Sequence, residues 1–155
     1  RSIPTQQALF GQMKSFVKQD HPDYSEAEIQ QAALRIVALP STDATKPSPH
    51  NTGGSIDLSI VDENGRLLDM GSPFDDISQR AKTTYYETEE TDPKYDAIRE
   101  NRRLLYHVMT QVGFTNYSEE WWHFDYGNQN WASLTDKGFA IYGATKPEFP
   151  WVEAY

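Results

Sequence analysis

Residues 48–65, with the sequence SPHNTGGSIDLSIVDENG, constrain the fold of this chain more than any other stretch. From residue 55 to residue 61 apolar and polar side chains alternate, which is typical of a β-strand with one buried face. The Asn-Gly pair that follows favours a tight hairpin turn and predicts a short return strand near residues 66–69. Asp57 falls on the polar face of the strand, opposite three aliphatic residues that we expect in the core, Ile56, Leu58 and Ile60.

Three other segments carry the apolar period of amphipathic helices. The first spans residues 5–18, the second begins at the capping box formed by Ser25 and Glu28, and the third begins at Pro93 and ends at Gly113. The side chains predicted to line their buried faces are Leu9, Phe10, Met13, Phe16 and Val17, then Ile29, Ala32, Ala33, Ile36 and Val37, then Ile98, Leu104, Leu105, Val108, Met109 and Val112.

The remaining segments predict strands near residues 114–117 and 121–126, a loop over 39–54, a loop with room for one helical turn over 71–91, and an irregular ending at TKPEFPW. Because the helical segments cluster instead of alternating with the strands, we expect an α+β fold with an antiparallel sheet and helices packed on one side. The sequence has no repeat or linker, so residues 1–155 are predicted to form a single domain.

Composition excludes several classes of function. The formal net charge is −9, and the 14 Lys and Arg residues are scattered, so we expect no nucleic-acid partner. No apolar run is long enough to predict a membrane span. The chain has no cysteine, so a metal site would have to consist of His, Asp and Glu side chains.

Two of the four histidines are candidates for chemistry. His21 precedes a proline in a turn and His107 lies within the third helix, so we expect both to have ordinary surface or packing roles. His50, His123 and Asp57 together resemble a catalytic zinc set with an open fourth position, where a bound water loses a proton near pH 7. Histidines in loops and aspartates in strands are also common in structural roles, and spacing alone does not bring these three together.

Glu120 is the candidate acid–base group for such a site, because it is a carboxylate outside the ligand set. It lies three residues before His123, which would put the two side chains on opposite faces of one regular strand. We therefore expect Glu120 in the turn before the strand, with its side chain bent back toward His123.

Two motifs carry a resemblance to a known family. Residues 48–57, SPHNTGGSID, and residues 120–123, EWWH, resemble the D-alanyl-D-alanine dipeptidases of the VanX type. These zinc metallopeptidases are related to D,D-carboxypeptidases and to the hedgehog domain. Residues 70–81, 100–124 and the opening RSIPTQQ also resemble family segments, so the resemblance covers nearly the whole chain.

The resemblance implies a hedgehog-like fold with one Zn²⁺ ion in a central cleft, D-alanyl-D-alanine as substrate, and Glu120 as general base. It further implies that Arg1 stabilises the oxyanion and that Ser48 and Asp75 bind the amino terminus of the dipeptide. The ligands that it implies for the zinc ion are His50, Asp57 and His123.

Several alternatives stay open. The family has an N-terminal portion that does not precede Arg1 here, so we expect a missing segment or a second chain in its place. A D,D- or L,D-carboxypeptidase acting on peptidoglycan stems is one rival function, although the double tryptophan of EWWH favours the dipeptidase. A hedgehog-like zinc module without turnover is another, although Glu120 argues against it. The sequence leaves the compartment, bacterial cytoplasm or periplasm, unknown.

Overall fold

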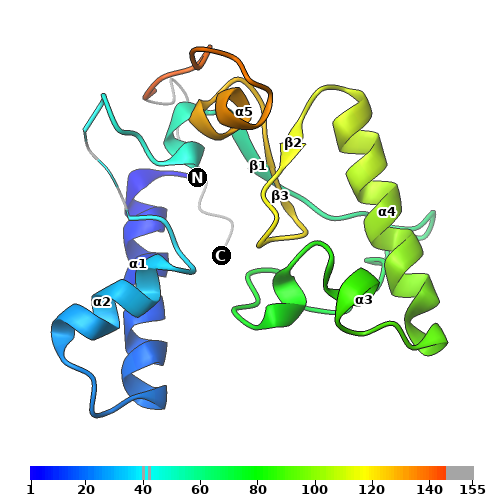
Figure 1. Ribbon diagram of the computed structural model, residues 1–155, viewed down its shortest axis with the longest axis horizontal. Helices are drawn as coiled ribbons and strands as arrows, with labels where there is room; N and C mark the ends of the chain where they lie inside the picture. Colours follow the sequence, from blue (N-terminus) through cyan, green and yellow to red (C-terminus); the bar gives the residue numbers. More distant parts are fainter. Residues whose placement is uncertain (40, 42, 146–155) are drawn as a thin grey trace. The chain divides into compact units, whose positions relative to one another are not determined.

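The computed structural model describes residues 1–39, 41 and 43–145 (Figure 1). The described residues form two compact units: Arg1–Gly53 together with residues 142–145, and Gly54–Ile141. The prediction of a single catalytic domain over residues 1–155 stays a prediction. The irregular ending predicted at TKPEFPW lies outside the described residues from residue 146 onward. No helix within the described ranges is long and apolar enough to cross a membrane.

The first unit is built on two helices that pack against each other, α1 (Ile3–Asp20) and α2 (Glu26–Leu34). Ser2 caps α1, and the predicted capping box of Ser25 and Glu28 is present at the start of α2. The second helix ends at Leu34, so the last two residues of its predicted stripe lie beyond it. The shared core consists of Phe10, Met13 and Ala33, with Ile36 and Val37 packed against it.

The second unit contains a three-stranded antiparallel sheet in the order β1-β3-β2, which confirms the predicted α+β class. Its strands are short: β1 is Ser55–Asp57, β2 is Thr115–Asn116 and β3 is His123–Asp125. All three residues of the central strand are buried. A further helix, α5 (Gln129–Leu134), follows the sheet and was not predicted; Asn128 caps it through a hydrogen bond from the backbone N–H of Trp131.

The hairpin predicted after β1 is present. Val61 and Leu67 form an isolated antiparallel bridge around the Asn-Gly turn, where Gly65 has a φ of +78°. Leu58 and Ile60 pack against the core as expected, but Ile56 is 44% exposed, so its predicted core position is wrong. The regular strand ends at Asp57. Beyond that residue the side chains no longer alternate between two faces, so Ile56 does not share a face with Leu58 and Ile60.

Short helices connect the hairpin to the long helix of the second unit. The segment predicted as a loop contains η2 (Gln79–Ala81) and α3 (Tyr85–Thr88), and Asp92 then caps η3 (Pro93–Tyr95), which leads directly into α4 (Asp96–Gln111). The chain leaves α4 through Gly113, as predicted, with a φ of +94°.

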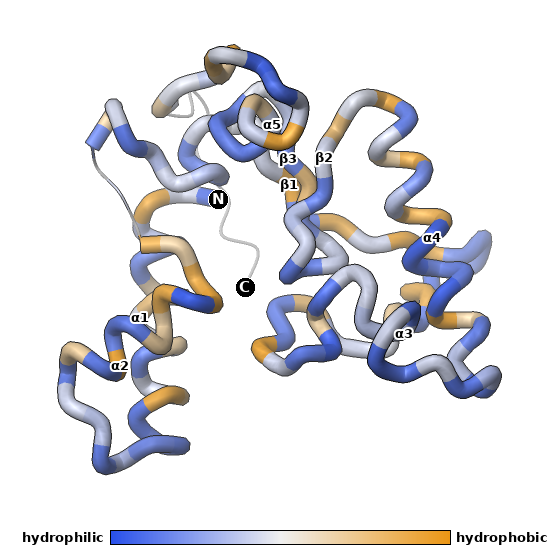
Figure 2. The backbone as a smooth tube through the Cα atoms, viewed as in Figure 1, coloured by the Kyte–Doolittle hydropathy of each residue, from blue (hydrophilic) through white to orange (hydrophobic). Residues whose placement is uncertain are grey.

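The buried face of α4 differs from the predicted one. Leu104, Val108 and Val112 are exposed, whereas Arg99 and Arg102 are buried. The guanidinium of Arg102 donates hydrogen bonds of 2.7 Å to the backbone carbonyls of Met70, Arg80 and Lys82. Apolar and polar residues alternate irregularly along α4 (Figure 2). The pattern of polarity does not identify the buried face of this helix, because Arg99 and Arg102 lie on that face and donate hydrogen bonds to backbone carbonyls.

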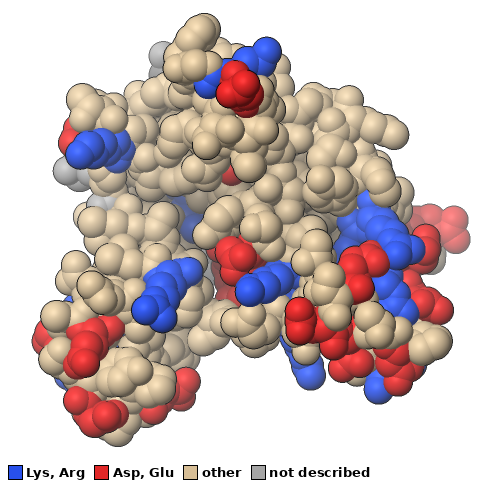
Figure 3. All heavy atoms as spheres, in the orientation of Figure 1, with Lys and Arg blue, Asp and Glu red and all other residues tan. Residues whose placement is uncertain are grey.

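The core of the second unit lies between α4, the loop that follows the hairpin, and β3. Its buried residues are Met70, Ala81, Leu105, Met109, Trp121, Trp122 and Phe124. At the surface around α3 and α4, Lys and Arg are interspersed with Asp and Glu on the face shown in Figure 3. Arg103, for example, pairs with Glu87 at 2.7 Å and with Glu100 at 3.1 Å.

Neighbouring leucines of α4 offer a test of this packing. Leu105 is 2% exposed and Leu104 is 49% exposed. We expect Leu105→Ala to lower the free energy of unfolding by about 2–5 kcal/mol through loss of burial and a residual cavity. Leu104→Ala is expected to change it by no more than about 0.5 kcal/mol, as for an ordinary surface position. Urea titration followed by circular dichroism measures both, and equal losses would contradict the exposed position of Leu104.

Candidate metal centre

Asp57 and His123 lie opposite each other on the paired strands β1 and β3. Their side chains meet on one side of the sheet, where Nδ1 of His123 is 2.9 Å from Oδ1 of Asp57. Both side chains are largely shielded from solvent, with exposed fractions of 7% for His123 and 10% for Asp57. Because side chains alternate along β1, Asp57 points to the side of the sheet on which the imidazole of His123 lies.

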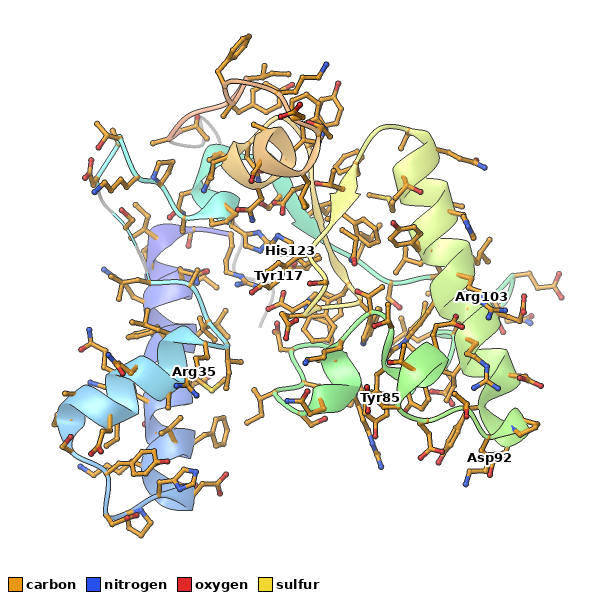
Figure 4. The ribbon with its side chains drawn as sticks, in the orientation of Figure 1. Arg35, Tyr85, Asp92, Arg103, Tyr117 and His123 are labelled. Carbon is orange, nitrogen blue, oxygen red and sulfur yellow. The ribbon has the colours of Figure 1, made fainter. Side chains whose placement is uncertain are left out.

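Glu120 lies in the turn that leads into β3, as the sequence predicted. The turn is closed by a hydrogen bond from the backbone N–H of Glu120 to the carbonyl of Tyr117. Oε2 of Glu120 is 3.7 Å from Nδ1 of His123, and its side chain keeps 23% of its surface exposed. Glu120 therefore approaches the same nitrogen as Asp57 but stays open to solvent. Tyr117 also lies beside His123, with ring centroids 5.8 Å apart (Figure 4).

His50 lies on η1 (Pro49–Thr52), a 3₁₀ turn within the segment that was predicted to be an irregular loop. Pro49 occupies its first position and Gly53 ends it with a φ of +71°, a left-handed conformation that favours glycine. The buried hydroxyl of Ser48 donates a 2.5 Å hydrogen bond to Oδ1 of Asn51 across the turn. The residue types around His50 thus fold the backbone into a tight turn just before β1.

The predicted ligand residues come together. One ligand atom from each of His50, Asp57 and His123 lies within 4.8 Å of the other two. Two imidazoles and one carboxylate suit a divalent transition metal, and three protein ligands leave a position open for water or substrate. The donor set present therefore fits a catalytic metal ion.

Asp125 is a functional candidate that sequence reasoning missed. It is 0% exposed, and its Oδ1 lies 3.1 Å from Nε2 of His123, on the ring nitrogen opposite the one that faces Asp57. Its position on the same face of the strand as His123 follows from their spacing of two residues, but nothing in the local sequence indicates a role for this carboxylate.

The His123 imidazole therefore lies between two carboxylates. Burial alone would lower its pKa, but the hydrogen bonds with Asp125 and Asp57 outweigh burial and raise the pKa of His123 to about 10. Burial also works against ionisation of Asp125, but the contact with His123 lowers the pKa of that carboxyl below its usual value. Both carboxylates thus stabilise a proton or a cation on the imidazole.

Three other predicted site residues occupy defined positions. In the first unit, Nη1 of Arg1 donates to Oε1 of Gln6 at 3.1 Å, and Asn51 donates to the backbone carbonyl of Arg1. Ser48 is buried against the same Asn51. In the second unit, Asp75 lies on an exposed loop with a φ of +59°. The roles predicted for Arg1, Ser48 and Asp75 stay predictions. His21 and His107 are exposed, in line with the surface roles expected for them.

Comparisons with known proteins identify the family of this chain. The model of a peptidase family, Peptidase M15, described as D-ala-D-ala dipeptidase, matches residues 12–142. A D-alanyl-D-alanine dipeptidase of Synechocystis is 34% identical over 116 residues, which make up 72% of this chain and 47% of that protein. One from Escherichia coli is 40% identical over 83 residues, or 54% of this chain and 40% of that protein.

A D-alanyl-D-alanine dipeptidase of Enterococcus faecalis is 36% identical over 78 residues, which cover 50% of this chain and 36% of that protein. The chain thus spans about half, or less, of the length of the curated relatives it matches. The family match itself covers most of the chain, including every predicted metal ligand and Glu120. The chain belongs to the Peptidase M15 family of D-ala-D-ala dipeptidases, a family of metallopeptidases.

Proposed function

We propose that the protein is a zinc-dependent dipeptidase that hydrolyses D-alanyl-D-alanine or a related D,D-dipeptide. The observation that carries the proposal is the group of His50, Asp57 and His123 with the carboxylate of Glu120 beside it. Three curated relatives from different bacteria bear the name D-alanyl-D-alanine dipeptidase, which supports this choice of substrate.

In this proposal His50, Asp57 and His123 hold one Zn²⁺ ion. When bound, the ion polarises a peptide carbonyl and brings the pKa of a water ligand near neutrality. Glu120 would accept a proton from the attacking water, a role that is supported by its 3.7 Å approach to Nδ1 of His123 and by its exposure to solvent. The same carboxyl then gives that proton to the departing amine, as a general acid.

The other predicted residues would bind and polarise the dipeptide. The guanidinium of Arg1 would offset the negative charge that develops on the carbonyl oxygen, an interaction that gains strength where water is excluded. Asp75 would pair with the ammonium group of the substrate, and Ser48 would accept a hydrogen bond from it. The substrate would thereby be held at its amino end, which selects a dipeptide over a longer chain.

Substrate length tests the proposal. We expect the full-length protein loaded with Zn²⁺ to hydrolyse D-alanyl-D-alanine with a kcat/KM at least about tenfold higher than that for a stem pentapeptide ending in the same pair. The pentapeptide lacks an ammonium group at this position, and loss of that contact costs about 1.4 kcal/mol or more. A D-amino-acid oxidase assay measures both. Preference for the pentapeptide would favour the carboxypeptidase, and zinc binding without any hydrolysis would favour the non-catalytic module.

A further inference from the structure

Asp125 is saturated with hydrogen bonds in a fully buried position. Its Oδ1 accepts from Oγ of Ser55 and from Nδ2 of Asn128, each at 2.5 Å, and its Oδ2 accepts from Nδ2 of Asn130 at 3.1 Å. Asn128 also donates to Ser55 at 2.9 Å, so the donors are linked to one another. A carboxylate held from several sides has little freedom to rotate, and it presents a fixed acceptor to Nε2 of His123.

The two nitrogens of His123 face different surroundings. Nδ1 lies beside Asp57 and Glu120, at 2.9 and 3.7 Å, and so faces the group of candidate ligands. Nε2 faces Asp125, whose Oδ1 lies 3.1 Å away. In a neutral imidazole only one nitrogen carries the proton, and the other has a lone pair for a metal ion.

We propose that Asp125 is the positioning residue that fixes the tautomer of His123, with the proton on Nε2 donated to Asp125 and the lone pair of Nδ1 kept for the metal ion. This inference rests on the proposed zinc centre. A histidine ligand whose other N–H is bound by a carboxylate is fixed in ring orientation and is a stronger donor to the metal. Asp125 itself would not be a ligand, because its oxygens already accept hydrogen bonds from protein donors.

Asp125→Asn is the variant that tests this role. The amide keeps the size of the side chain but has one acceptor oxygen, for which Ser55 and Asn128 compete with His123. We expect Zn²⁺, measured by competition with a chromophoric chelator, to bind the full-length variant about 10–100-fold more weakly than the unmodified protein. Tyr86→Phe is the control, since it also removes a buried hydrogen bond, from its hydroxyl to the carbonyl of Gly71, and should leave Zn²⁺ affinity within about twofold.

A second measurement needs no variant. In the full-length protein labelled with ¹⁵N-histidine and loaded with Zn²⁺, the His123 resonances should show a proton on Nε2 and none on Nδ1. A proton on Nδ1, or equal Zn²⁺ affinity of folded Asp125→Asn and unmodified protein, would overturn the role of Asp125 while leaving the zinc centre intact. Failure of the unmodified protein to bind Zn²⁺ would overturn the zinc centre and this inference together.

Discussion

Replacing Glu120 with alanine is expected to lower kcat for D-alanyl-D-alanine by a factor of about 10²–10⁴ while zinc stays bound. The carboxyl lies 3.7 Å from Nδ1 of His123, and its removal takes away the group that we propose moves the proton but none of the three proposed ligands. Steady-state kinetics on protein with a measured zinc content check the result, and KM should change less than kcat.

The neighbouring glutamate provides a matched control. Glu119 has the same charge, its side chain is 51% exposed, and it forms an ion pair of 3.7 Å with Lys82. Glu119→Ala should leave kcat within about twofold of the unmodified enzyme, as expected for a surface position. Full activity of zinc-loaded Glu120→Ala would show that another group moves the proton, and an equal loss in both variants would point to a change in net charge.

Removal of His123 is the second change for which we expect a large effect. His123→Ala deletes one of three proposed ligands and leaves two carboxylates, the largely shielded Asp57 and the fully buried Asp125, without their shared partner. Zn²⁺ affinity should fall by more than the factor of about 10–100 that loss of an outer hydrogen-bond partner costs. Hydrolysis of D-alanyl-D-alanine should fall below detection.

His107→Ala is the control, since His107 is an exposed histidine on α4. It should keep both zinc content, measured by atomic absorption, and activity. In the unmodified protein, a chelator should abolish hydrolysis and added Zn²⁺ should restore it. Activity that survives complete removal of metal would contradict the proposed centre, whatever the behaviour of the histidine variants.

The elements most visible in the sequence were those with strong local signals. The capping box at Ser25 and the Asn-Gly hairpin both form, because each depends on hydrogen bonds between residues close in the chain. The buried face of α4 was assigned partly wrongly because Arg99 and Arg102 lie on it. Their partners are backbone carbonyls distant along the chain, which a periodicity of side chains does not reveal.

The candidate site shows the same division. Asp57 and the bend at Glu120 followed from the alternation of a strand, which is a local property. The resemblance to the family, and not the spacing of the residues, implied that His50, Asp57 and His123 lie together, because spacing alone does not show that distant segments converge. The sequence does not indicate a role for Asp125, because its environment depends on residues outside its own strand. Ser55 on β1 and Asn128 in the following turn both donate hydrogen bonds to its carboxylate.

The guanidinium of Arg102 also has a consequence for the loop that carries Asp75. It binds the carbonyls of Met70 and Arg80, and so it closes the chain between them into a loop whose two ends are fixed on α4. Between these ends the loop is held again by Ser72, which accepts a 3.0 Å hydrogen bond from Nε1 of Trp121, and by Phe74, whose ring packs on that of Trp122 with centroids 5.5 Å apart, so the loop that carries Asp75 is tied to the core beside β3.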